Sequence, residues 1–277
     1  MSRSRLIVAA GLAVGVLSLP ARGGTLPADA LPIPNRVATA DLVVAGKVTA
    51  VEDKGVMAAP SPGANKVEYR VAVVTLGDGL PAPANVKTVR LGFVPTPPMV
   101  VINPPPFQPA VGTEGVFLLN KNADGDFYVA HGQLQFISKN NPNFDKDIAQ
   151  VRRCLKILED PDAALKGTNA EDRFLAAAML VARYRTARGP NAATEPVEAA
   201  RSKLILEALA AADWTPSTDF TRLSPLMVLH RLPLTEKDGW KPPPPQDQKA
   251  YAAYAQQWVK EHAGTYRIPR FVADKGK

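Results

Sequence analysis

The stretch Asp41-Leu-Val-Val-Ala-Gly-Lys-Val-Thr-Ala-Val51 decides the fold of the first half of the chain. Its apolar and polar residues alternate with a period of two, which is typical of a half-buried β-strand. One face carries Leu42, Val44, Val48 and Ala50, and the other carries Lys47 and Thr49. Gly46 lies in the middle, where a missing side chain permits a bend or a bulge. A long strand that bends at a glycine can serve two sheets of a small barrel.

The sequence after this strand predicts the rest of such a barrel. Further segments of strand character are expected at 67–76, 86–93, 115–120, 126–130 and 133–137. Lys121-Asn-Ala-Asp-Gly125 has strong turn chemistry and predicts a hairpin. Several short strands with irregular loops indicate a small, closed or partly open antiparallel barrel.

Residues 95–109 interrupt this pattern with seven prolines. Proline cannot donate to a sheet ladder, so we expect an extended loop inserted in the barrel. Such a stiff loop can present Met99, Ile102 and Phe107 to a partner at low entropic cost.

Helical periodicity replaces the strand pattern after about residue 140. Helices are expected at 145–158, from a capping box at Thr168-Asn-Ala-Glu171 to about 185, at 194–212, from Ser224-Pro225, and at 246–262. The chain is therefore predicted to be α+β, with a β-barrel domain at 25–138 and a helical bundle or helix-pair domain at 139–277.

The first 24 residues predict a secretory signal peptide, because arginines at 3 and 5 precede an apolar run at 6–19 and small residues. We expect an exported protein, periplasmic or extracellular, with no membrane span in the mature chain. The formal charge of +7 falls to +4 when Arg3, Arg5 and Arg22 leave with the signal. That balance gives no support to a nucleic-acid partner.

The segments "ADLVVAGKVTAVE", "YRVAVVTLGDGL" and "VFLLNKNADGDFYVA" give the first half a family resemblance. This half resembles the barrel of uncharacterised exported bacterial proteins with an N-terminal OB-fold-like domain of the netrin type, which tissue inhibitors of metalloproteinases share. The resemblance covers about residues 38–137 and implies a fold without an activity. Netrin-like domains use several cysteines, whereas this chain has Cys154 alone. That difference argues against an inhibitor role.

A partial calcium-loop pattern lies in the hairpin, where Asn120, Asn122, Asp124 and Asp126 place oxygen-bearing side chains at alternate positions. Position 12 of that pattern is His131 rather than glutamate, and strands flank the loop. A plain hairpin turn explains the same residues, and we favour it.

Other candidate sites have a simpler structural interpretation. Cys154, at helical spacing, is predicted to be a buried, inert thiol rather than a reactive one. The three histidines, His131, His230 and His262, form no paired zinc motif. The sequence carries no nucleotide-binding glycine loop and no nucleophile motif, so we expect no catalytic residues, no metal and no cofactor.

Two surface features leave alternatives open. Arg152, Arg153, Lys156, Arg183, Arg185 and Arg188 form either a basic patch for an anionic polymer or an ordinary solvated face. Tyr251, Tyr254 and Trp258 form an aromatic stripe on the last helix, which either binds a partner or packs on the preceding helices.

These observations favour a non-catalytic exported binding or scaffolding protein, whose partner is an envelope or extracellular protein or a glycan. A cell-envelope hydrolase with its site between barrel and helices is the alternative from another class. An inhibitor of an extracellular protease is the third hypothesis. A strand of sugar or nucleic acid lying across the barrel face is a further binding mode to consider.

Overall fold

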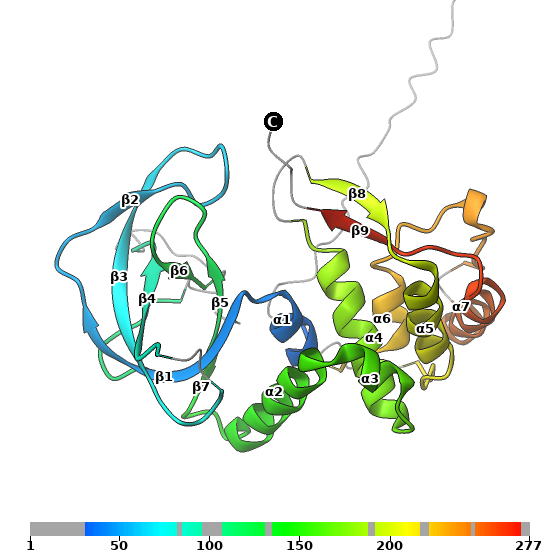
Figure 1. Cartoon of the computed structure of the whole chain (residues 1–277), viewed down its shortest axis with the longest axis horizontal. Helices are drawn as coiled ribbons and strands as arrows, with labels where there is room; N and C mark the ends of the chain where they lie inside the picture. The colour runs from blue at the N-terminus through cyan, green and yellow to red at the C-terminus, as the bar shows by residue number, and fades with distance from the viewer. Residues whose placement is uncertain are drawn as a thin grey trace, which may run out of the picture.

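The computed structural model describes residues 31–81, 85–95, 107–130, 135–187, 192–216, 222–244 and 247–272. The molecule is α+β, with a closed barrel of five strands in the N-terminal half. Figure 1 shows helices following the barrel strands along the chain. This confirms the predicted fold class. The predictions for residues 1–24 and for Met99, Ile102, His131 and Arg188 concern positions outside the described residues.

The barrel strands are β1 (Leu42–Val51), β3 (Val67–Leu76), β4 (Thr88–Phe93), β5 (Glu114–Lys121) and β6 (Tyr128–Val129). They pair in the order β1-β3-β4-β6-β5, and β5 pairs back to β1 to close the ring. Strands β3, β4 and β5 form a Greek key with β1, since β5 returns to lie beside β1. A five-stranded Greek-key barrel is the architecture of the OB-fold. One pairing differs from the antiparallel prediction, because β4 and β6 run parallel.

Strand β1 belongs to both sides of the barrel, as its glycine predicted. Leu42–Lys47 pairs with β5, and Gly46–Val51 pairs with β3, so the change of partner falls at Gly46. A Cβ atom at Gly46 would lie 2.6 Å from the Thr75 carbonyl oxygen, closer than side chains allow. The bulge itself falls between Val48 and Ala50. Ala50 is therefore exposed, contrary to the predicted alternation.

The interior of the barrel is aliphatic with one phenylalanine. Its buried residues are Val44, Val48, Ala72, Val74, Val89, Leu91, Phe117 and Leu119. Two short strands extend the sheet outside the ring, β2 (Val56–Ala58) on β3 and β7 (Phe136–Ser138) on β5.

The helical half contains α2 (Phe144–Glu159), α3 (Pro161–Lys166), α4 (Ala170–Tyr184), α5 (Ala199–Ala210), α6 (Pro225–Leu229) and α7 (Gln248–His262). A 3₁₀ turn (Glu236–Asp238) precedes α7. A small ribbon joins β8 (Ala193–Pro196) to β9 (Pro269–Val272). The prediction of helix from residue 194 was wrong there, because 194–196 pair with the chain end, which no local pattern announces.

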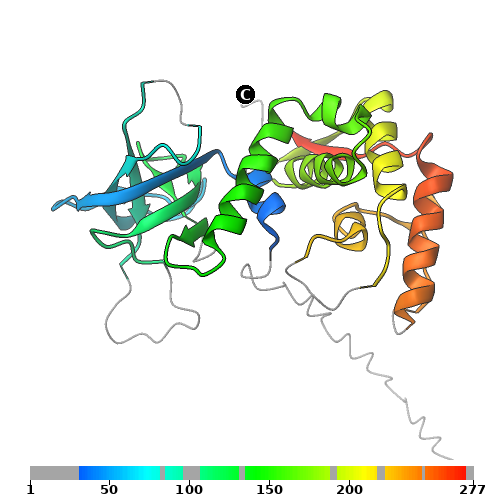
Figure 2. The ribbon, with the colours of Figure 1, turned by 90° about the horizontal axis from the view of Figure 1, so that it is seen from below.

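The segment before the barrel is a helix, α1 (Ile33–Thr39). Pro34 occupies its first turn, in which a missing N–H costs no hydrogen bond. Helix α1 packs on α2 and α4, and Arg183 of α4 donates a 2.9 Å hydrogen bond from Nε to the Ala38 carbonyl. Figure 2 shows α1 and α2 between the barrel and the other helices.

One hydrophobic cluster spans both halves of the molecule. It takes Val43, Val116, Leu118 and Ile137 from the outer face of the barrel. It continues through Ile148, Val151, Cys154 and Ile157 of α2 into α4 and α5. Strand β1 is thus buried on both faces, with Val44 in the barrel and Val43 against the helices.

Candidate functional site

A groove opens where the outer face of the barrel meets α2. Its volume is about 750 Å³. Strands β1 and β5, the turn between β3 and β4, and the first half of α2 supply its walls. It therefore lies at the barrel–helix junction.

The apolar part of the groove comes from both sides of this junction. Ala45 and Leu76 line it from the barrel, and Phe144 and Ile148 line it from α2, one helical turn apart. Gly77 lines it as well, and a Cβ atom there would meet no atom within 4 Å. The backbone of the β3–β4 turn is thus open to the groove.

The charged part of the groove is mixed in sign. Lys139 Nζ lies 2.5 Å from Glu114 Oε1, and this hydrogen bond holds the pKa of Glu114 below its usual value. Lys47, opposite Glu114 in the β1–β5 pairing, lowers that pKa further. Glu114 is therefore an ionised acceptor at neutral pH. Asp78 and Asp145 add two more carboxylates.

The remaining polar groups of the groove are tied to one another. Arg152 donates from Nε to the Gly79 carbonyl at 3.0 Å, which joins α2 to the β3–β4 turn. The Thr49 and Thr75 hydroxyls lie 3.0 Å apart. No histidine, cysteine or serine lines the groove among the described residues, so neither threonine hydroxyl has an imidazole beside it as a general base.

The arrangement suits binding by shape and charge. An apolar floor with cations and carboxylates at its rim can orient a ligand that carries both polar and apolar groups. Sequence reasoning placed Lys47 on the outer face of its strand but did not single out Glu114 or Lys139. Only the pairing of β5 with β1 and with β7 brings them together, and no local sequence pattern predicts those pairings.

The residues of the calcium-like pattern have structural roles in the hairpin. Asn122 is buried and donates from Nδ2 to the Ala59 carbonyl at 3.1 Å. Asp124 Oδ2 accepts from the Ala59 N–H at 3.1 Å and lies 3.0 Å from Lys66 Nζ. Within the described residues, His, Cys, Asp and Glu nowhere gather in threes as a metal site requires. Asn122 and Asp124 thus join the hairpin to Ala59, the residue after β2, whereas Asn120 lies in β5.

Phe107, which was predicted to be presented to a partner, is half-buried in the structure. Its ring stacks on Phe136 with centroids 4.8 Å apart and lies 6.4 Å from Phe117. It therefore packs against the barrel core, because burying an aromatic ring is more favourable than exposing it.

The face that OB-type barrels use for strands of sugar or nucleic acid is covered here. That face lies on the second and third barrel strands between two loops. Tyr69 of β3 instead packs on Phe127, with ring centroids 5.1 Å apart, and Ala58 and Val129 complete this cluster. Arg90 of β4 binds Glu52 with two 2.8 Å hydrogen bonds. These contacts join β3 to Phe127 and β4 to Glu52, which follows β1.

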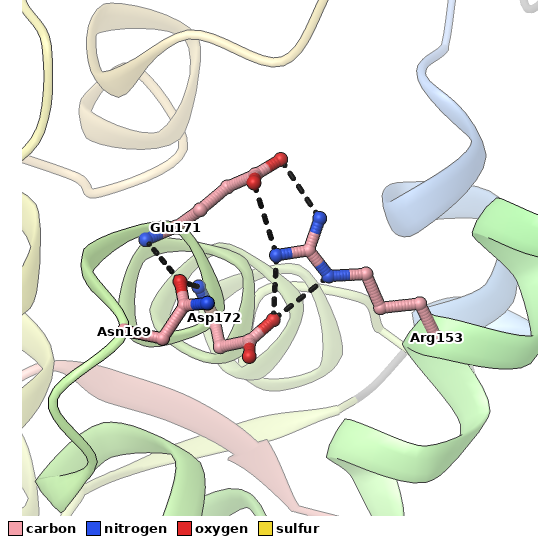
Figure 3. A network of polar contacts seen from close by, with 4 residues as sticks. All are labelled: Arg153, Asn169, Glu171 and Asp172. Carbon is pink, nitrogen blue, oxygen red and sulfur yellow. Dashed lines mark hydrogen bonds and ion pairs between the residues drawn. The ribbon is translucent and has the colours of Figure 1, made fainter.

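The arginines of the predicted basic patch bind separate partners. Figure 3 shows Arg153 of α2 between Glu171 and Asp172, with hydrogen bonds of 3.0 Å from Nη2 to Glu171 and 2.8 Å from Nε to Asp172. Both carboxylates raise the pKa of Arg153. Arg185 lies over the Phe271 ring, 4.5 Å from its centroid. Arg153 thus joins α2 to α4, whereas Arg185 contacts β9.

Cys154 and the aromatic stripe follow their structural interpretations. Cys154 is fully buried, which confirms that part of the prediction, and burial raises the pKa of its thiol to about 12. Trp240 packs against Tyr251, Tyr254 and Trp258 of the stripe. His262 stacks on Trp258, 4.6 Å between centroids. The stripe therefore holds the segment before α7.

No family model, curated protein or solved structure matches this chain. Across the described part of the chain, every helix falls short of the length or apolar character that crossing a bilayer requires.

Proposed function

We propose that the protein is a non-catalytic, exported binding protein whose ligand lies in the groove between barrel and α2. The observation that carries this proposal is the groove itself, with an apolar floor and an ion-paired rim. Export rests on the arginines and apolar run of the first 24 residues. The netrin-like resemblance to exported bacterial proteins belongs to the same proposal.

The class of partner is inferred from the expected location of the protein and from the side chains that line the groove. An exported protein meets envelope or extracellular proteins and glycans. A protein segment or a glycan can present hydrogen-bonding groups to Lys47 and Glu114 while an apolar part contacts Phe144 and Ile148. Nucleic acid is not proposed, because the rim alternates in sign and the strand-binding face of the barrel is covered.

Gly77→Trp provides the test, because Gly77 lines the groove and a Cβ atom at this position meets nothing within 4 Å. Native extract from the cell envelope is passed over the mature wild-type chain and over the variant. We expect one stoichiometric partner on the wild type and its loss on Gly77→Trp. The matched control is Gly264→Trp after α7, where a Cβ atom also meets nothing within 4 Å. Equal capture by Gly77→Trp would contradict the use of the groove.

A hydrolase in the same groove is the second candidate. The groove lies where that hypothesis places a site, and it contains the carboxylates Asp78, Glu114 and Asp145. Its weakness is Glu114, whose lowered pKa suits an ion-pair partner better than a general acid. Hydrolysis of envelope glycan or peptide by the wild type, lost in Asp145→Asn, would move the assignment to this candidate.

A further inference from the structure

Helix α1 carries an arginine whose hydrogen-bonding groups are buried and unused. Arg36 is 9% exposed, and its Nε and Nη2 atoms have no hydrogen-bond partner among the described residues. The preceding residue, Asn35, is 1% exposed, and within the same part of the chain neither its Nδ2 nor its Oδ1 has a partner. Buried polar groups in proteins are nearly always bonded, so two neighbouring exceptions point to something that binds there.

The two free atoms of Arg36 are the pair that recognises a carboxylate. Nε and one terminal nitrogen lie on the same side of the guanidinium plane, and together they match the two oxygens of a carboxylate. The same chain uses this fork elsewhere. Arg90 binds both oxygens of Glu52 through Nε and Nη2, each at 2.8 Å. Arg201 binds both oxygens of Asp162 through the same two atoms.

No carboxylate among the described residues fills the fork of Arg36. Asp147 of α2 acts on Arg36 through its charge, but the two form no ion pair within 4.0 Å. Burial lowers the pKa of Arg36 to about 10 in spite of this charge. A guanidinium held in a dry interior is costly until an anion binds to it.

We propose that Arg36 is the receptor for a small organic carboxylate, which takes the Nε–Nη2 fork on α1 at the barrel–helix junction. The carboxylate supplies the two oxygens that Glu52 and Asp162 supply to the other two forks. Arg36 does not line the groove described above, so this site goes beyond the proposed function. The small size of the ligand follows from the burial of the fork.

Thermal unfolding with acetate, compared with chloride at equal ionic strength, tests the proposal on the full mature chain. Acetate at a hundred times its Kd is expected to raise the Tm by about 5 °C. Arg36→Lys keeps the charge but lacks the fork, so it is expected to lose this rise. Arg201→Lys makes the same change at a fork that Asp162 already fills, and it is expected to keep the rise.

Binding of labelled acetate to the wild type by equilibrium dialysis needs no variant and is expected to reach one per chain. A wild type that acetate stabilises no more than chloride, or an Arg36→Lys variant that responds like the wild type, overturns the proposal.

An internal carboxylate is the competing occupant. Asp29 is the only acidic residue before Asp41 in the sequence. Under our proposal Asp29→Asn responds to acetate as the wild type does. A response that appears only in Asp29→Asn would assign the fork to Asp29 and overturn the external ligand.

Discussion

At the scale of single residues, Gly46 matters because two strands approach β1 at that position. An added methyl group would lie 2.6 Å from the Thr75 oxygen and 2.8 Å from Val74 Cγ1. We expect Gly46→Ala to lower the free energy of unfolding by about 2 kcal/mol, the usual cost of overpacking. Urea denaturation measures it. Gly77→Ala, where the methyl group meets open space, is the control and should change little; equal losses in both would contradict the steric argument.

The Glu52–Arg90 pair gives a pH-dependent prediction. The hydrogen bonds from Arg90 lower the pKa of Glu52 below 4.5. A depressed carboxyl pKa adds stability that is complete above the unfolded value and is lost as pH falls through the folded value.

We therefore expect Glu52→Gln to lower the free energy of unfolding by about 1 kcal/mol at pH 7. The loss is modest because the pair is partly exposed. The cost should vanish in acid below the lowered pKa. Urea midpoints of wild type and variant from pH 7 to pH 3 measure it. Asp53→Asn, at the exposed neighbouring position, controls for the change in net charge. A difference that is constant with pH would count against the pair.

At the scale of elements, the residue that caps the start of α4 differs from the predicted one. The sequence predicted a capping box led by Thr168. In the structure the Asn169 side chain accepts hydrogen bonds from the N–H groups of Glu171 and Asp172. Figure 3 shows how this cap brings both carboxylates to Arg153. We expect Asn169→Ala to lower the free energy of unfolding by about 1 kcal/mol and Thr168→Ala to lower it much less. Thermal unfolding measures both changes. A larger loss in Thr168→Ala than in Asn169→Ala would support the predicted capping box instead.

Elements with strong local patterns were predictable, and elements that depend on distant partners were not. The alternation of 67–76 gave β3 its correct bounds, and the hairpin chemistry after Lys121 placed β5 and β6. Helix α1 has seven residues, and its partners lie in α2 and α4. Strand β8 has four residues and pairs with residues at the other end of the helical half. The groove could not be predicted from the sequence for the same reason, because its walls come together only in the folded chain.

At the scale of the whole molecule, the shared cluster predicts that barrel and helices unfold together. Leu118 faces the helices and Leu119 faces the barrel interior, and both are fully buried. The three tryptophans, Trp214, Trp240 and Trp258, all lie in the helical half.

We expect Leu118→Ala and Leu119→Ala each to lower the urea midpoint seen by tryptophan fluorescence, with a loss of about 3 kcal/mol. Far-ultraviolet circular dichroism should give the same midpoints. A tryptophan transition that ignores Leu119→Ala would mean that the barrel unfolds separately.

The contact of α1 with α4 also fixes an order of events. Ala38 and Arg183, which it joins, are 145 positions apart. A chain made from its amino end produces α1 before α2 and α4, so the face of α1 that carries Val37 and Ala38 is not fully covered until α4 has been made. We expect docking of α1 to be a late step of folding, whose rate depends on closing a long loop. A chain that crosses a membrane before it folds has all of its partners present when that step begins.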